Sequence, residues 1–88
     1  MSIETTILHV RDGLISDLLK LARRHEPLRE RSPQRYAIEV KKDIRLYLDD
    51  IGSRPTMLDF YSLCHVSQEE FIRDVTDTVM MLLFGKKN

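Results

Sequence analysis

The side chains best suited to chemistry are thinly spread along this chain of 88 residues. Its three histidines, His9, His25 and His65, fall in different predicted elements, and together with the single Cys64 they lack the paired spacing of a zinc site. Cys64 and His65 are neighbours in sequence, and neighbouring side chains in a helix or turn point apart, so they do not predict a thiolate–imidazole pair. We therefore expect no metal and no cofactor.

Acidic residues and glycines also lack the arrangement of an active site. Asp49-Asp50 and Glu69-Glu70 are adjacent acids on predicted solvent faces, whereas acid–base catalysis needs carboxylates placed around a substrate in a cleft. The three glycines are scattered and form no phosphate-binding loop. Cys64 lies at an apolar spacing, which is typical of a small core residue. The sequence thus predicts a protein that is not an enzyme.

Residues 56–84 have the pattern of a helix-turn-helix-like unit. A short predicted helix is followed by a turn at 65–67 and by a helix that opens on Ser67, with Glu70 three residues later as in a capping box. In DNA-binding proteins the same order of elements places the second helix in the major groove. This pattern raises the hypothesis of a nucleic-acid-binding protein.

The charge of this unit opposes DNA binding. Within 56–76 the side chains available to contact bases are Gln68 and Arg73. Residues 56–84 carry five acids and one base, a net charge of −4. Phosphates repel such a surface, and neutralising phosphates supplies most of the affinity of non-specific binding. Asp74 also falls where the second helix of such a unit needs a core residue.

The alternative surface for nucleic acid is the Arg-rich loop 20–35. Its candidate phosphate contacts are Arg23, Arg24, Arg29, Arg31 and Arg35. Residues 20–54 carry ten basic and six acidic side chains, a net charge of +4, so the chain is dipolar with a basic middle and an acidic C-terminal third. Acids lie among the arginines and can pair with them locally, which leaves a solvated helix face as the competing explanation.

Four helices and no strand are predicted to position these residues. Apolar spacings of three and four residues give the ranges Thr5–Arg24, Pro33–Ile51, Met57–Cys64 and Gln68–Phe84. The segment 25–34, which is rich in charge and contains two prolines, is predicted to connect the first two helices. The sequence therefore predicts one all-α domain over 1–88, a small bundle with two longer N-terminal helices, a short third helix and a long C-terminal helix.

Capping residues mark the predicted helix ends. The expected N-caps are, in chain order, Thr5 or Thr6, Ser32, Thr56 and Ser67. Gly52 stands where the second helix needs a left-handed residue to end it, and Pro55 follows as a block to continuation. Gly85 has the same stopping role after the last helix.

The sequence holds more apolar surface than an interior of this size can bury. The run 79–84 is apolar around the whole circumference of its helix, so one inner face cannot account for it. The predicted inner face of that helix is Phe71, Ile72, Val75, Val79, Leu82 and Leu83. We expect the excess to contact a partner, through Phe60, Tyr61, Met80, Met81 and Phe84. Ile38 and Leu46 fall off the inner face of the second helix and suggest a further partner-facing surface.

These observations favour a small regulatory or adaptor protein that binds a protein partner and forms a homodimer. The alternative is a transcriptional regulator that binds nucleic acid through the helix-turn-helix-like unit or the Arg-rich loop. A single cysteine excludes an intrachain disulfide, which favours a reduced cytoplasmic compartment. Charges interrupt the first twenty residues, so no signal peptide is predicted, and the longest apolar run is far shorter than the ~20 residues that span a bilayer. We expect a soluble, cytoplasmic protein.

Overall fold

The structure is a computed structural model that describes residues 2–85. Over those residues the chain forms helices and no strand, which confirms the predicted all-α class. The helices are α1 (Ile3–Arg23), α2 (Glu26–Arg31), α3 (Pro33–Gly52), α4 (Pro55–Cys64) and α5 (Gln68–Phe84). Four of them match the predicted ranges closely, and α2 is an additional short helix within the segment predicted as a connection.

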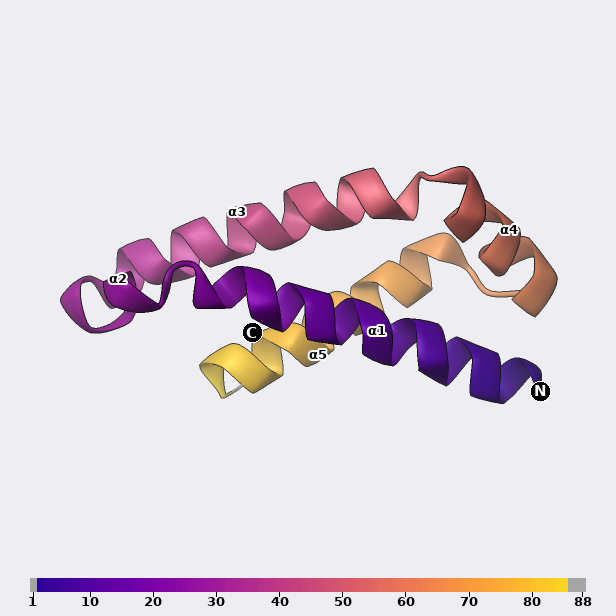
Figure 1. The fold of residues 1–88 in the computed structure, drawn as a ribbon, viewed down its shortest axis with the longest axis horizontal. Helices are drawn as coiled ribbons and strands as arrows, with labels where there is room; N and C mark the ends of the chain where they lie inside the picture. Colours follow the sequence, from indigo (N-terminus) through magenta and orange to yellow (C-terminus); the bar gives the residue numbers. More distant parts are fainter. Residues whose placement is uncertain (1, 86–88) are drawn as a thin grey trace.

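The three long helices lie lengthwise in an elongated bundle of 44 × 22 × 20 Å (Figure 1). α3 runs antiparallel to α1, and α5 crosses α1 and packs against both α1 and α3. α2 turns the chain at one end of the bundle, and α4 turns it at the other. Because α1 contacts α5, the first and last helices of the described chain pack against each other.

Side-chain caps fix several helix ends as predicted. The Ser32 hydroxyl accepts a hydrogen bond from the Arg35 backbone N–H at 3.4 Å, and the Ser67 hydroxyl accepts one from the Glu70 N–H at 3.3 Å. Gly85 ends α5 in the left-handed conformation with φ 79°. α1 begins earlier than predicted, because its cap is Ser2 rather than Thr5 or Thr6.

A proline lies in the first turn of three helices, α2, α3 and α4. α1 ends at Arg23, close to the predicted position, but Pro27 then lies in the first turn of α2, where the missing N–H costs nothing. Pro55 likewise begins α4, whose N-cap is Arg54, so the predicted cap at Thr56 is wrong. Proline thus blocks the preceding helix and starts the next one at both ends of the bundle.

Gly52 has a different role from the one predicted. It is the last residue of α3 and does not adopt positive φ, which within residues 2–85 occurs at His65 and Gly85. Gly52 is buried, and a Cβ atom there would lie 3.4 Å from the Ile72 Cδ1 and 3.5 Å from the Tyr61 hydroxyl oxygen. A methyl group there would make ordinary van der Waals contact, and the carbonyl oxygen of Gly52 accepts hydrogen bonds from Tyr61 and Gln68.

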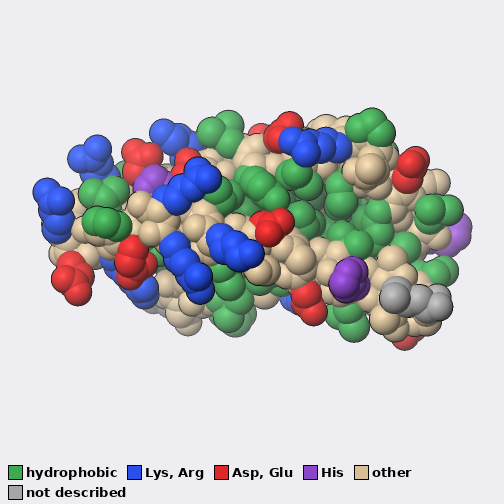
Figure 2. Space-filling view, viewed as in Figure 1, with side chains coloured by type: hydrophobic (Ala, Val, Ile, Leu, Met, Phe, Trp, Pro, Cys, Tyr) green, Lys and Arg blue, Asp and Glu red, His purple; other side chains and the backbone are tan. Residues whose placement is uncertain are grey.

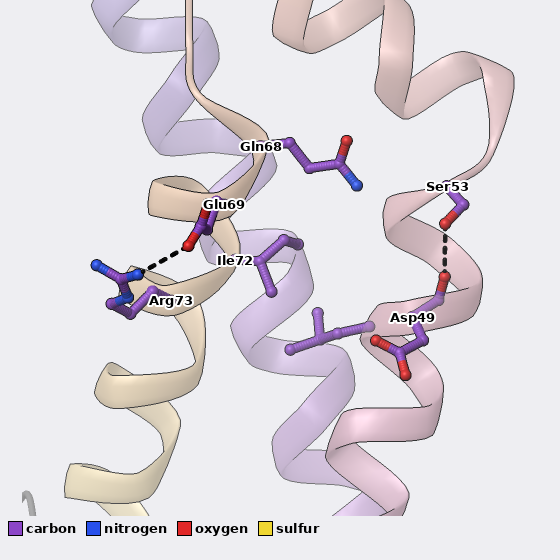
Figure 3. A pocket seen from close by; sticks show the side chains of 7 residues that line it. Asp49, Ser53, Gln68, Glu69, Ile72 and Arg73 are labelled. Atoms are coloured by element: carbon purple, nitrogen blue, oxygen red, sulfur yellow. Dashed lines mark hydrogen bonds and ion pairs between the residues drawn. The ribbon is translucent and has the colours of Figure 1, made fainter.

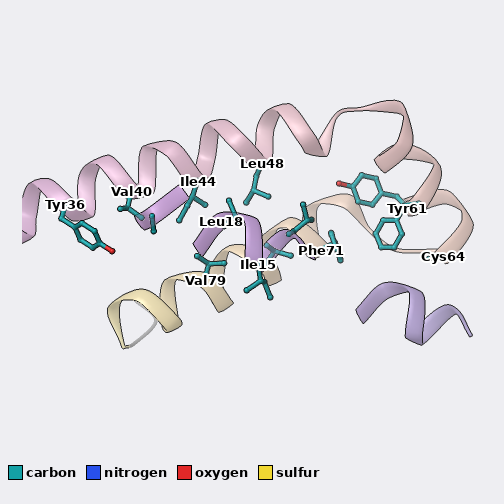
Figure 4. Close-up of a cluster of buried hydrophobic side chains, with 14 residues drawn as sticks. Ile15, Leu18, Tyr36, Val40, Ile44, Leu48, Tyr61, Cys64, Phe71 and Val79 are labelled. Carbon is teal, nitrogen blue, oxygen red and sulfur yellow. The ribbon is translucent and has the colours of Figure 1, made fainter. Parts of the chain in front are cut away.

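One cluster of buried apolar side chains runs along the bundle (Figure 4). Its most completely buried members are Leu18 of α1, Val40 and Ile44 of α3, and Val75 and Val79 of α5. The inner faces predicted for α1, α3 and α5 thus meet at the centre. Burying side chains of this size stabilises the fold by about 1.5–3 kcal/mol each relative to exposure.

Candidate functional site

The turn between α4 and α5 has the predicted tight geometry. His65 adopts the left-handed conformation with φ 54° and ψ 45°, and the Val66 N–H donates to the Tyr61 carbonyl oxygen at 2.9 Å. The two helices enclose the rings of Phe60, Tyr61 and Phe71, whose centroids lie 5.1–6.1 Å apart. Phe60 and Tyr61, predicted as partner contacts, are only 8% and 7% exposed, so within this chain they belong to the core.

The N-terminal end of α5 faces α3 across a cleft of about 560 Å³ (Figure 3). The Gln68 amide donates to the Gly52 carbonyl oxygen at 3.3 Å, and Arg73 pairs with Glu69 at 3.1 Å. Leu48 and Ile72 supply the apolar surface of this cleft. The two side chains predicted to read bases are therefore engaged by neighbours in this chain, and the start of α5 packs beside α3.

Asp74 connects the first and last helices instead of occupying the core. The Arg11 Nε donates to the Asp74 carboxylate at 2.6 Å, and the Arg11 Nη2 donates to the Thr78 hydroxyl at 2.8 Å. This contact fixes one side of α5 against α1. It also orients the next turn of α5, because Leu82 lies one turn beyond Thr78 on the same side.

The C-terminal end of α5 leaves apolar side chains uncovered. Met81 is 49% exposed and Leu82 is 60% exposed, whereas Met80 and Phe84 are partly buried. The Phe84 ring packs edge-on against Tyr36 at 5.9 Å between centroids. The prediction that Leu82 faces inward is wrong, since α5 crosses α1 and its C-terminal end lies to one side of that helix (Figure 1).

A shallow depression of about 320 Å³ follows the flank of α1, the helix that α5 packs against. It is lined by Asp12, Ile15, Ser16, Leu19, Lys20 and Arg23. We call this lining, together with Met81 and Leu82 of α5, the α1–α5 seam. The sequence interpretation missed Leu19, whose apolar side chain beside the inner face was the available signal for a wider apolar flank.

Cations gather at the end of the bundle formed by α2 (left in Figure 2). We call this group, Lys20, Arg23, Arg24, Arg29, Arg31 and Arg35, the basic end, and all six side chains are exposed. His25 Nε2 lies 2.5 Å from an Asp43 carboxylate oxygen, which fastens the start of α2 to α3. The structure thus brings all five predicted loop arginines to one end and holds them on helices or, for Arg24, at a helix cap.

The two remaining features predicted for partner binding lie apart from the seam. Ile38 and Leu46, on the outer side of α3, are 64% and 57% exposed.

In the part of the chain that the structure describes, no three His, Cys, Asp or Glu side chains are grouped closely enough to hold a metal ion. Nor does any helix there combine the length and apolar character needed to cross a membrane.

Two tyrosines make the stability of the fold depend on pH in the alkaline range. Burial raises the pKa of Tyr61, whose hydroxyl donates to the Gly52 carbonyl at 3.3 Å. Burial, and then the hydrogen bond to Asp17, raise the pKa of Tyr47. Because the folded chain holds these protons more tightly than the unfolded chain, their contribution to stability is complete below about pH 10 and is lost as the pH rises through the raised values.

We therefore expect the thermal midpoint Tm to fall as the pH is raised above about 10. The double variant Tyr47→Phe, Tyr61→Phe should be less stable at neutral pH but should lose less stability between neutral and alkaline pH. Thermal melts followed by circular dichroism at both pH values measure this difference. Equal alkaline losses in wild type and variant would show that other groups cause this loss.

Comparison with protein families, with curated proteins and with solved structures found no match to this chain.

Proposed function

We propose that this chain is a small non-enzymatic interaction protein that acts as a homodimer, with the α1–α5 seam as the contact between the two copies. The observation that carries the proposal is the exposure of Met81 and Leu82 on α5, together with a depression holding Ile15 and Leu19 on α1, the helix that α5 packs against. Apolar surface exposed in a contiguous patch favours burial against a partner. The surfaces outside the seam would stay open to a protein partner, which suits a regulatory or adaptor role.

The charge pattern of the seam favours a second copy as its occupant. Along α1 the depression carries Asp12 at one end, the apolar Ile15 and Leu19 in the middle, and Lys20 and Arg23 at the other end. A twofold axis through the middle would place the acidic end of one copy against the basic end of its partner. The same surface is thus complementary to itself in the antiparallel orientation.

Replacing Met81 and Leu82 together by serine is expected to dissociate the dimer. Each copy loses two apolar side chains, so the dimer loses four, and at about 1.5 kcal/mol each the dissociation constant would rise roughly ten-thousandfold. Light scattering coupled to gel filtration, over a dilution series, measures the mass of wild type and variant. Leu63→Ser is the matched control, because Leu63 is 74% exposed on α4, away from the seam.

A charge exchange tests the antiparallel arrangement directly. Asp12→Lys alone and Lys20→Asp alone should each weaken the dimer, because each places like charges opposite one another. The double variant carries both changes in each copy and should recover most of the affinity. A wild-type chain that is monomeric at every concentration would contradict the dimer, and a double variant weaker than both single variants would contradict the twofold pairing.

A further inference from the structure

The basic end carries more positive charge than its own acids neutralise. Residues 20–35 contain six cations and two acids, a net charge of +4. Arg29 pairs with Glu26 at 3.4 Å, but the other five cations of the basic end have no ion pair within residues 2–85. Nearby acids of α3 are occupied, since Glu39 pairs with Lys42 and Asp43 contacts His25. An anionic partner would therefore meet five cations without ion pairs, offset by the single acid Glu30.

Folding fixes these cations in space. Arg23 lies in the last turn of α1, Arg31 in α2 and Arg35 in the first turn of α3. The His25–Asp43 contact and the partly buried Leu28 attach α2 to the bundle. Charges on short, anchored helices lose less conformational freedom on binding than charges on a flexible loop. The basic end is thus a preformed surface.

The chemistry around the basic end favours a polyanion over a protein partner. Within the described chain, no large apolar side chain is exposed between residues 9 and 37. Protein interfaces generally have an apolar core, and residues 20–35 supply no exposed large apolar side chain to one, the nearest in sequence being Ile38. Exposed arginines match phosphate groups, because the planar guanidinium forms paired hydrogen bonds with phosphate oxygens.

We propose that the basic end binds the phosphate backbone of nucleic acid without selecting a base sequence. Residues 55–84 carry a net charge of −4 and would repel the same polymer, so the chain binds with the α2 end towards the phosphates. Lys20 and Arg23 also line the α1–α5 seam, whereas Arg24, Arg29, Arg31 and Arg35 lie outside it. The proposal uses neither Gln68 nor Arg73. It assigns the nucleic-acid contact to the Arg-rich segment instead of the helix-turn-helix-like unit.

Fluorescence anisotropy with a labelled short DNA duplex and a labelled single-stranded RNA, over about 20–200 mM salt, tests the proposal. Five neutralised phosphates predict a slope of about −4 to −5 for the logarithm of the duplex affinity against the logarithm of salt concentration. Arg23→Gln, Arg24→Gln should weaken binding at least about tenfold and reduce the slope by about 2. Arg31→Gln, Arg35→Gln should do the same, and it provides a second variant if the first unfolds.

Controls separate this surface from total charge and from the helix-turn-helix-like unit. Arg45→Gln, Arg54→Gln removes the same charge elsewhere and should change the affinity less than about threefold. Gln68→Ala, Arg73→Ala should leave it unchanged. Polyglutamate should compete at least about tenfold more weakly than duplex DNA, because duplex DNA carries a charge every ~1.7 Å of its axis and an extended peptide one every ~3.3 Å.

No binding at the lowest salt would overturn the proposal. An equal loss in the Arg45, Arg54 control would show that only net charge matters, and a large loss in the Gln68, Arg73 variant would move the contact to α5. Polyglutamate competing as well as DNA would make an acidic protein segment the partner. The Arg31, Arg35 variant and both control variants change residues outside the α1–α5 seam, so their results test the assignment without bearing on the oligomeric state.

Discussion

Replacing Val79 by aspartate is expected to unfold the chain. Val79 is fully buried at the centre of α5, where it faces the inner surfaces of the other long helices. An aspartate there would be a buried charge without a partner, which costs more than about 4 kcal/mol and also removes the apolar contact. A domain of this size has roughly 4–13 kcal/mol of stability, so little or none would remain.

Loss of helical circular dichroism and of a cooperative thermal transition measures this effect. Met81→Asp is the matched control, because it introduces the same group two residues further along α5, where the side chain is 49% exposed. That variant should stay folded and should lose the dimer. A folded Val79→Asp chain with a Tm near that of the wild type would show that the inner face of α5 has been assigned wrongly.

Replacing Phe71 by alanine is expected to give the second-largest loss of stability. Phe71 is 5% exposed, and its ring lies 5.1 Å from the Phe60 ring and 6.1 Å from the Tyr61 ring. Removing a buried phenyl ring costs about 3–5 kcal/mol through lost burial and the cavity that remains. In a domain of this length that loss lowers the Tm by at least about 12 °C.

Leu63→Ala is the control for this variant. Leu63 lies on α4 beside the same three rings but is 74% exposed, so its truncation should change the stability by less than about 0.5 kcal/mol. The pair of variants also tests where Phe60 and Tyr61 act. If the rings met a partner instead of one another, Phe71→Ala would change the mass in solution while leaving the Tm of the diluted chain unchanged.

The long helices were predictable because their buried residues recur with helical spacing. In α3, Tyr36, Val40, Ile44 and Leu48 are four residues apart and all are buried, and Ser32 caps the helix at the predicted position. These signals lie within one segment of sequence. The fold class and most helix bounds therefore follow from local pattern alone.

The features that sequence failed to predict depend on contacts between segments. α2 has only six residues, and a helix this short is not stable through local propensity alone. The His25–Asp43 contact secures it against α3. Tyr61 is buried because α3 ends at Gly52, close enough to accept its hydrogen bond. Leu82 repeats the spacing of Val75 but is exposed, because helical spacing does not reveal the angle at which α5 crosses α1.

The candidate surfaces were predicted only in part, because they too depend on contacts between segments. The arginines of the basic end were found from composition, since charge clusters are visible in sequence, although their placement on helices was not. Of the predicted apolar contacts, Met81 is clearly exposed, while Phe60 and Tyr61 are in the core. The α1–α5 seam needed the structure, because its residues come from helices that are distant in sequence.

The contact between α1 and α5 has a consequence during protein synthesis. Arg11 and Asp74 are 63 positions apart, and Val75 and Val79 complete a core whose other residues are made earlier. While a ribosome is still translating α5, the nascent chain exposes the apolar face of α1 that α5 will cover. Folding is therefore completed late, and a chain truncated before α5 would present that face to chaperones and proteases.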